Sequence, residues 1–264
     1  MTTATLTERI IARKEGAVGW LIFNNPERRN AISVDMWEAI PQVIAQYEAD
    51  PEVRVIVLAG AGDKAFVSGA DISQFEKQRS SADAVQRYEE LAEGAAAKLA
   101  GCDKPLVAMI RGYCLGGGVN IAVLCDIRIA ADDARFGIPA AKMGLGYRAS
   151  SMKGLVEVVG AAYAREIMIT ARQFTAAEAR EMGLINKITA KENLESVVKE
   201  YTDAIGGNAP LTMRTAKRII RELGRVDYDA AKTKAWAKEC FDSEDYKEGR
   251  KAFMEKRKPV FKGH

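Results

Sequence analysis

The sequence predicts an α/β fold, and three observations carry that prediction. Apolar runs rich in β-branched residues alternate with amphipathic segments through about residue 160. Beyond that point strand patterns fade, and after residues 206–210 the chain is helical and strongly charged. The 264 residues include 48% hydrophobic and 28% charged residues, which is typical of a globular chain. This length favours one domain, with at most a smaller appendage.

The N-terminal part shows the alternation most clearly. Its two opening strand-like runs are separated by Glu15-Gly16, and Ser33 is a candidate cap for the first helix. The expected elements are strands at 10–13 and 18–23, a helix over 34–49, a strand at 53–58, a helix over 82–99, a strand at 106–110, a short apolar stretch at 119–125 and a strand at 127–130.

The C-terminal part is expected to be helical. The segments 175–178 and 189–192 both fit the capping box, so helices should begin there. Residues 206–210, GGNAP, form the best candidate linker. The sequence therefore predicts a core over residues 1–205 and a separate helical region over residues 206–264.

Charge and apolar patterning exclude several classes of protein. The net charge is +3, from 39 basic and 36 acidic residues, so nucleic acid is not expected as a partner. The sequence lacks an apolar run of the roughly 20 residues that a membrane helix needs. The polar N-terminus resembles neither a signal peptide nor a transit peptide. These features predict a cytoplasmic protein without a membrane partner.

Histidine and cysteine usage narrows the chemistry further. The single histidine is the terminal residue His264, and a frayed imidazole suits neither a Ser-His-Asp triad nor a Cys-His pair. Zinc catalysis usually uses histidine ligands as well. The four cysteines lack metal-type spacing and are interpreted as reduced thiols. We therefore expect no metal site.

Two glycine-containing segments carry the chemical signal. They are residues 65–72, AFVSGADI, and residues 111–120, RGYCLGGGVN. Three glycines after a strand permit close approach of the backbone to a ligand. A helix beginning near Gly118 would point free N–H groups outward, which suits a developing negative oxygen. The alternative is that these glycines only let a strand and a helix pack closely.

A second glycine pattern favours a different function. Residues 60–65, GAGDKA, match G-x-G-x-x-A after a strand, the pattern of dinucleotide binding. That interpretation requires a helix to begin at once, whereas residues 65–67 look extended. A nicotinamide-dependent oxidoreductase is kept only as an alternative.

Taken together, the motifs resemble the crotonase superfamily, the enoyl-CoA hydratase/isomerase family. The resemblance spans the chain from about residue 10 and is carried by AFVSGADI, GYCLGGGVN, CDIRIA at 125–130, FGIP at 136–139, TAAEA with GLI at 175–185, and the segment 243–258. It implies stacked ββα turns forming a spiral core with a C-terminal helical region for oligomerisation and coenzyme A contact. It also implies trimers or pairs of trimers, a coenzyme A thioester substrate and no further cofactor.

The resemblance also assigns roles to individual residues. It implies an oxyanion hole formed by the backbone N–H groups of Ala70 and Gly117. Further positions match residues that bind coenzyme A or substrate in the family. For the charged and aromatic residues among them, the alternative is that they are solvated surface charges or aromatic side chains that pack a helix. The positions matched to coenzyme A or substrate binding are Arg28, Arg29, Ala31, Ser68, Gly69, Asp71, Ile72, Phe253 and Lys256.

The chain departs from the hydratase pattern at two positions. Hydratases of this family hold a water between two glutamates, and here the matching residues are Asn120 and Ala140. An amide does not titrate near neutral pH and a methyl group cannot hydrogen-bond, so hydration by that route is disfavoured.

Other residues suggest different reactions. Tyr147 resembles a tyrosine of methylmalonyl-CoA decarboxylases and is a candidate proton donor, with a packing role as the alternative. Arg148 is a candidate partner for a carboxylate. An isomerase carboxylate could come from Glu76 or Asp71, although a hydrogen bond that structures the loop is the favoured role for Asp71. The reactions that remain open are isomerisation, decarboxylation of a malonyl-type thioester and non-catalytic binding of an acyl-CoA.

Overall fold

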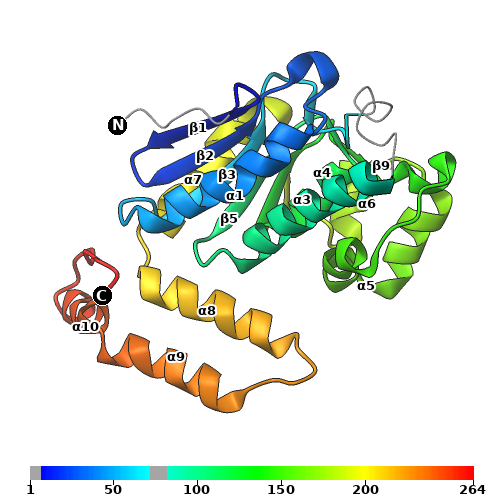
Figure 1. The fold of residues 1–264 in the computed structure, drawn as a ribbon. Helices are drawn as coiled ribbons and strands as arrows, with labels where there is room; N and C mark the ends of the chain where they lie inside the picture. The colour runs from blue at the N-terminus through cyan, green and yellow to red at the C-terminus, as the bar shows by residue number, and fades with distance from the viewer. Residues whose placement is uncertain (1–6, 72–81) are drawn as a thin grey trace.

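The computed structural model describes residues 7–71 and 82–264, and its centre is a pair of stacked β-sheets (Figure 1). Within these ranges, the larger sheet has six strands in the order β1-β2-β3-β5-β7-β10, and the smaller has four in the order β4-β6-β8-β9. The strands are β1 (Ile10–Glu15), β2 (Val18–Phe23), β3 (Val55–Gly60), β4 (Ala65–Val67), β5 (Leu106–Ile110), β6 (Tyr113–Leu115), β7 (Ile127–Ala131), β8 (Arg135–Gly137), β9 (Phe174–Thr175) and β10 (Lys187–Thr189).

Helices cover both sheets and continue beyond them. The α-helices described are α1 (Val34–Ala49), α3 (Ala82–Gly101), α4 (Gly117–Val123), α5 (Ala149–Thr170), α6 (Ala176–Glu181), α7 (Leu194–Gly206), α8 (Pro210–Leu223), α9 (Ala230–Asp242) and α10 (Glu244–Met254). None of the helices described is long and apolar enough to cross a membrane.

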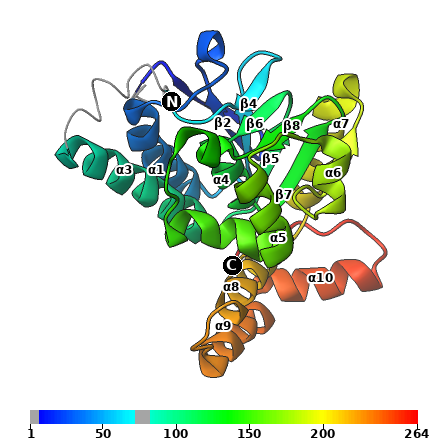
Figure 2. The same ribbon diagram turned by 90° about the vertical axis from the view of Figure 1, so that its right-hand side faces the viewer.

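The core repeats one supersecondary unit. Strands β3, β5 and β7 each pass directly to β4, β6 and β8, and each pair is followed by a helix: α3, α4 and α5 respectively. Successive turns add parallel strands to both sheets, β3-β5-β7 to the larger and β4-β6-β8 to the smaller. This confirms the predicted stacked ββα spiral. It also brings the carboxyl ends of β4 and β6 together at one edge (Figure 2).

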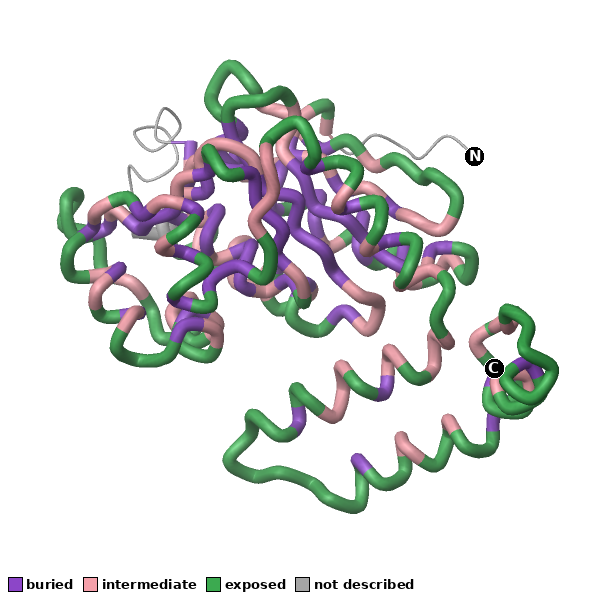
Figure 3. Tube along the Cα trace, turned by 180° about the vertical axis from the view of Figure 1, so that it is seen from behind, coloured by how far each residue is buried: buried purple, intermediate pink, exposed green. Residues whose placement is uncertain are grey.

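Burial on both faces explains why β3 is a continuous apolar run. Ile56 and Leu58 belong to the main core, whereas Val55 and Val57 pack with Leu194 on the opposite face of the same strand. Side chains alternate across a strand, so a strand covered on both faces needs apolar residues at every position. Figure 3 shows these buried strands as the centre of the molecule.

The C-terminal helices α8, α9 and α10 extend from the core (Figures 1 and 2). Polar contacts attach them: Lys217 Nζ lies 2.7 Å from an Asp126 carboxylate oxygen, and Arg218 pairs with Asp103. Large apolar side chains remain exposed on these helices, including Ile220 at 70% and Met254 at 81% of their surface. Such exposed apolar surface typically marks an interface.

The structure differs from the sequence-based expectation at two places after residue 160. Thr189 does not cap a helix but ends strand β10, and a 3₁₀ turn, Lys191–Asn193, precedes α7. Strands β9 and β10 were not predicted. Both have at most three residues, too few for a period-two pattern to be recognised. The other predicted capping box, at residues 175–178, is confirmed, since Thr175 Oγ1 accepts a hydrogen bond from Glu178 N.

Candidate active site

The loop after β4 is held by the segment that precedes α1. Ser68 N donates to Arg29 O (3.2 Å), and Ser68 Oγ donates to Arg28 O (3.2 Å). Asn30 is fully buried, and its Nδ2 donates to Ala65 O at 2.8 Å. Hydrogen bonds therefore join residues 27–31, ERRNA, to residues 65–71, AFVSGAD, although the two segments are far apart in sequence.

The position of Ala70 frees its N–H group. Ala70 forms a parallel bridge with Ile32, in which Ile32 N donates to Gly69 O (2.8 Å) and Asp71 N donates to Ile32 O (2.9 Å). In this parallel pattern the segment around Ile32 bonds to Gly69 and Asp71, so the N–H of Ala70 between them points away from that segment. Among the residues that the structure describes, Ala70 N–H has no hydrogen-bond acceptor.

The glycine loop after β6 runs directly into α4. Gly116 adopts φ 52° and ψ −115°, a conformation that favours glycine, and its N–H donates to Gly137 O at 2.8 Å. Gly117 is the first helical residue, so its N–H has no acceptor within α4. Gly118 packs on β4 so closely that a Cβ there would lie 2.2 Å from Val67 O.

The two loops face each other at short range. A Cβ on Gly116 would lie 3.6 Å from Gly69 Cα, and one on Gly69 would lie 3.6 Å from Leu115 O. The structure therefore places Ala70 and Gly117 on facing loops, each with an N–H group that is not used by the backbone around it. Two such donors can stabilise one oxygen on which negative charge develops.

Tyr147 and Asn120 lie beside these loops. The Tyr147 hydroxyl oxygen would be 3.9 Å from a Cβ on Gly116. Burial raises the pKa of the Tyr147 phenol, the nearby Tyr88 acts in the same direction, and a hydrogen bond from the Asn120 side chain opposes them. The phenol is thus neutral and able to donate at physiological pH. Asn120 Oδ1 is buried and has no hydrogen-bond partner among the described residues.

The next residue, Arg148, is already paired. Its guanidinium contacts Glu89 and lies 3.5 Å from Glu93 Oε1, both on α3, and Ser150 Oγ donates to Glu93 at 2.8 Å. Arg148 therefore joins α3 to the start of α5. Ala140 is buried, as expected of an apolar side chain.

The residues matched to coenzyme A binding differ in their burial and contacts. Ala31 is buried, and Arg28 and Arg29 are exposed. The Arg29 guanidinium carbon lies 4.9 Å from the centre of the Tyr113 ring. Phe253 in α10 and Lys256 just beyond it are exposed. Figure 2 shows α10 away from β4 and β6, so this single chain does not bring this segment to the two loops.

Ile72 and Glu76 lie outside the described residues. Asp71 is buried, and its backbone N–H takes part in the bridge to Ile32. Over 7–71 and 82–264, no group of three or more His, Cys, Asp or Glu side chains could hold a metal ion.

The structure removes the dinucleotide-binding alternative and leaves Cys114 without a chemical role. Ala65 begins strand β4 rather than a helix, so the GAGDKA segment lacks the helix that dinucleotide binding requires. Cys114 is fully buried, and burial raises the pKa of its thiol, which makes it an unreactive packing residue.

Sequence reasoning missed two aromatic residues of the site. Trp37 Cζ2 would lie 3.9 Å from a Cβ on Gly117, and Tyr88 of α3 adjoins Tyr147. Both sit on amphipathic helices, where an aromatic residue is indistinguishable from ordinary core. Only the packing of α1 and α3 against the spiral brings them to the loops.

Comparisons with known proteins agree over most of the chain. A sequence model described as enoyl-CoA hydratase/isomerase matches residues 13–264. The chain is 36% identical over 252 residues to a short-chain-enoyl-CoA hydratase of Clostridium acetobutylicum, covering 94% of this chain and 95% of that protein. It is 33% identical over 280 residues to a peroxisomal Delta(3,5)-Delta(2,4)-dienoyl-CoA isomerase of Arabidopsis thaliana, covering 99% of both.

Solved structures give the same result. An enoyl-CoA hydratase/carnithine racemase from Magnetospirillum magneticum superposes with a TM-score of 0.92 at 33% identity, covering 98% of this chain and 97% of that one. An enoyl-CoA hydratase/isomerase family protein from Hyphomonas neptunium, described as putative in its own name, has a TM-score of 0.92 at 35% identity, covering 98% and 99%.

Proposed function

The chain belongs to the enoyl-CoA hydratase/isomerase family, and from this premise we propose that it stabilises the enolate of an acyl-CoA thioester at the N–H groups of Ala70 and Gly117. The facing of these two loops is the observation that carries the proposal. When the thioester forms an enolate, its oxygen gains negative charge between the two donors. Removing one donor of such a pair typically costs about 2.7–4 kcal/mol of transition-state stabilisation.

The remaining loop residues shape the binding site around the thioester. Ser68, Gly69 and Asp71 carry the backbone past it, and Ala31 lies in the segment that holds this loop. Arg28 and Arg29 precede Ala31 in the chain and are cationic and exposed, which suits the phosphates of coenzyme A. No cofactor beyond the coenzyme A moiety of the substrate enters this proposal.

The residues beside the loops disfavour hydration. Addition of water requires one group that takes a proton and another that gives one. Asn120 offers an amide and Ala140 a methyl group, and neither takes a proton at neutral pH. The unpaired Asn120 Oδ1 is instead suited to accept a hydrogen bond from the substrate.

Tyr147 favours decarboxylation of a malonyl-type thioester as the specific reaction. That reaction needs no base: the bond from the α-carbon to the carboxylate breaks, carbon dioxide leaves, and the electron pair forms the enolate. The α-carbon then takes one proton, and the neutral Tyr147 phenol beside Gly116 can supply it. Solvent reprotonates the phenol.

One incubation tests both the general and the specific proposal. Crotonyl-CoA, a 3-enoyl-CoA, malonyl-CoA and methylmalonyl-CoA are incubated together, and the products are read by mass spectrometry. Loss of carbon dioxide from a malonyl thioester supports decarboxylation. A shifted double bond supports isomerisation, and water added to crotonyl-CoA contradicts the argument from Asn120 and Ala140. If coenzyme A binds but nothing turns over, the chain is a binding protein and the catalytic proposal is wrong.

Assembly into a homotrimer or homohexamer forms part of the proposal. The exposed apolar side chains on α8 and α10 need a partner surface, and a second copy of this chain is one. In such an assembly, Phe253 and Lys256 would contact coenzyme A bound to a neighbouring copy. Sedimentation equilibrium of the full chain tests this, because a monomeric mass would contradict it.

A further inference from the structure

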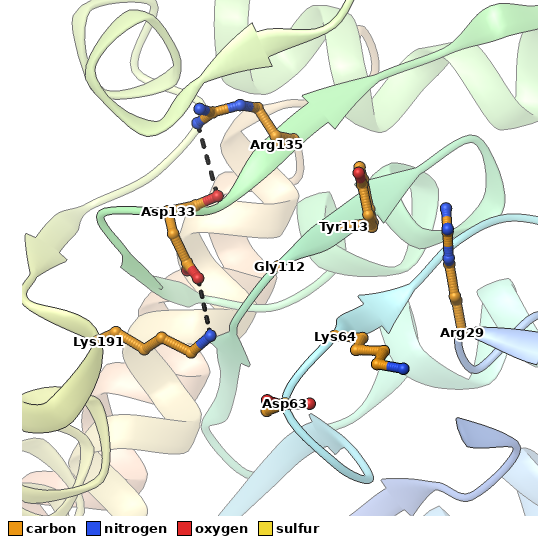
Figure 4. Close-up of a pocket in the computed structure, with 8 residues that line it drawn as sticks. All are labelled: Arg29, Asp63, Lys64, Gly112, Tyr113, Asp133, Arg135 and Lys191. Atoms are coloured by element: carbon orange, nitrogen blue, oxygen red, sulfur yellow. Dashed lines mark hydrogen bonds and ion pairs between the residues drawn. The ribbon is translucent and has the colours of Figure 1, made fainter. Parts of the chain in front are cut away.

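A pocket of about 350 Å³ lies at the opposite end of the small sheet from the glycine loops (Figure 4). Lys64 directly precedes β4, Gly112 precedes β6, and Arg135 begins β8, so the pocket gathers the amino ends of these strands. Three residues separate Lys64 from the loop after β4, and a strand of that length spans about 10 Å. The pocket is therefore distinct from the place where the thioester oxygen is proposed to bind.

Positive charge dominates the lining of the pocket. Four of its side chains are cationic and two are anionic, which leaves a net charge of +2: Arg29, Lys64, Arg135 and Lys191 against Asp63 and Asp133. Lys191 Nζ lies 2.9 Å from Asp133 Oδ2, and this contact holds the pKa of Lys191 above its ordinary value. That leaves Arg29, Lys64 and Arg135 with Asp63 as the other carboxylate of the lining.

The three other cations have little to pair with. Figure 4 shows no ion pair between Lys64 or Arg29 and the other residues drawn, and both lie on the same side of Gly112. Arg29 is instead held against the Tyr113 ring. Arg135 donates through Nη1 to the backbone oxygen of Ala134 at 3.1 Å. A guanidinium has five N–H donors, so most of those on Arg135 stay available.

The backbone fixes where these charges sit. A Cβ on Gly112 would lie only 2.0 Å from Lys64 O, so the amino ends of β4 and β6 touch. Tyr113 N donates to Lys64 O at 3.1 Å, and this bond anchors the backbone from which the Lys64 side chain starts. The cations are thus carried by sheet-anchored segments rather than by a free loop.

We propose that this pocket binds the phosphate group of an organic phosphate. A dianionic phosphate matches the excess positive charge, and guanidinium groups bind its oxygens with paired hydrogen bonds. The volume exceeds what a phosphate ion needs and leaves room for an attached organic group. The phosphate belongs either to the coenzyme A of the substrate or to a separate metabolite. The first of these two sources rests on the proposed function.

Direct titration tests the site without any turnover. Inorganic phosphate and ADP are titrated into the full chain by calorimetry at fixed ionic strength, because exposed charges are screened by salt. Lys64→Gln should weaken both affinities by about tenfold, the usual effect of losing a hydrogen bond to a charged group. The matched control is Lys234→Gln, which removes the same charge from an exposed position on α9 and should leave both affinities unchanged.

Coenzyme A then identifies the source of the phosphate. If saturating coenzyme A abolishes ADP binding, the pocket holds the substrate's own phosphates. If ADP still binds, the pocket serves a separate ligand. Absence of phosphate and ADP binding, or equal affinities for the Lys64→Gln and Lys234→Gln variants, would overturn the proposal. Because these titrations measure binding and not turnover, their results test the pocket even if the chain turns over no thioester.

Discussion

The phenol oxygen of Tyr147 lies 3.9 Å from the point that a Cβ on Gly116 would occupy. Gly116 immediately precedes Gly117, whose N–H is one of the two proposed oxyanion donors. A neutral proton donor therefore adjoins the place where an enolate would form. Gly116 adopts φ 52°, a conformation that favours glycine, so this residue type holds the loop that lies beside the phenol.

Replacing Tyr147 by phenylalanine tests that relationship. Tyr147→Phe keeps the ring and removes the hydroxyl, so the fold should persist while the proton donor is lost. We expect kcat to fall by about 10²–10⁴-fold with little change in KM, the usual contribution of a general acid. Tyr163→Phe removes the same atom from another half-buried tyrosine of the same core and should keep parental turnover. Parental kcat in Tyr147→Phe would leave the phenol without a role in proton transfer.

Proline at position 117 tests the oxyanion donor. Gly117 is the first residue of α4, where proline is well tolerated because that N–H has no partner within the helix. Gly117→Pro should therefore fold, yet lower kcat by about 10²–10³-fold, the usual loss for one oxyanion donor.

The control for this experiment is alanine at the same position. Gly117→Ala keeps the N–H, and its Cβ would lie 3.9 Å from Trp37 Cζ2, an ordinary contact. It should retain activity within a few-fold of the parent. Equal activity in the proline and alanine variants would mean that the N–H of residue 117 does not bind the substrate oxygen.

Strand and helix positions in the core were largely predictable, because β-branched runs and amphipathic spacing are local signals. The run at 106–110 coincides with β5, and Ser33 is the N-cap of α1 as expected. The short strands β9 and β10 were missed because their pairing with β8 and β7 is set by tertiary contacts.

The site was predictable only where its signal is carried by the backbone. Glycines at 116–118 mark the loop: Gly116 adopts a conformation that favours glycine, and at Gly118 a close approach to Val67 leaves no room for a side chain. The neighbourhood of Tyr147 could not be predicted, since Tyr88 and Glu89 reach it from α3 through packing alone. Nor does the pattern of charges reveal that Lys64 and Lys191 share a pocket across more than a hundred residues of sequence.

Gly118 should be intolerant of any side chain. In Gly118→Ala the new Cβ would lie 2.2 Å from Val67 O, a backbone atom that cannot move without disturbing β4. We expect the free energy of unfolding in urea to fall by about 1–3 kcal/mol, as in overpacked cores. Gly94→Ala on α3 meets no atom within 4 Å and should be neutral or stabilising, by about 0.5–1 kcal/mol. A stable Gly118→Ala variant would contradict the close approach of α4 to β4.

Stability at alkaline pH should depend on Tyr47. Its side chain is buried under β1 and β2, and its hydroxyl lies 2.8 Å from Trp20 O and 3.1 Å from Arg13 O. Burial raises the pKa of Tyr47 to about 12, although the interaction with Arg13 opposes this. Below pH 10 the phenol is protonated in both the folded and the unfolded chain, so its ionisation does not affect stability there.

Between pH 10 and pH 12 the unfolded chain releases this proton first, so the folded chain binds more protons and its stability falls as the pH rises. After allowance for solvent screening, the loss attributable to Tyr47 should be about 1–2 kcal/mol. Urea unfolding at pH 9 and at pH 11.5 measures it against Tyr47→Phe, which has no phenol to ionise. The free energy of unfolding of the parent, relative to that of the variant, should fall by that amount across this range, because only the parent has a phenol at position 47 that the unfolded chain deprotonates first. Parallel pH profiles for the two proteins would show that the Tyr47 phenol ionises as easily in the folded chain as in the unfolded one.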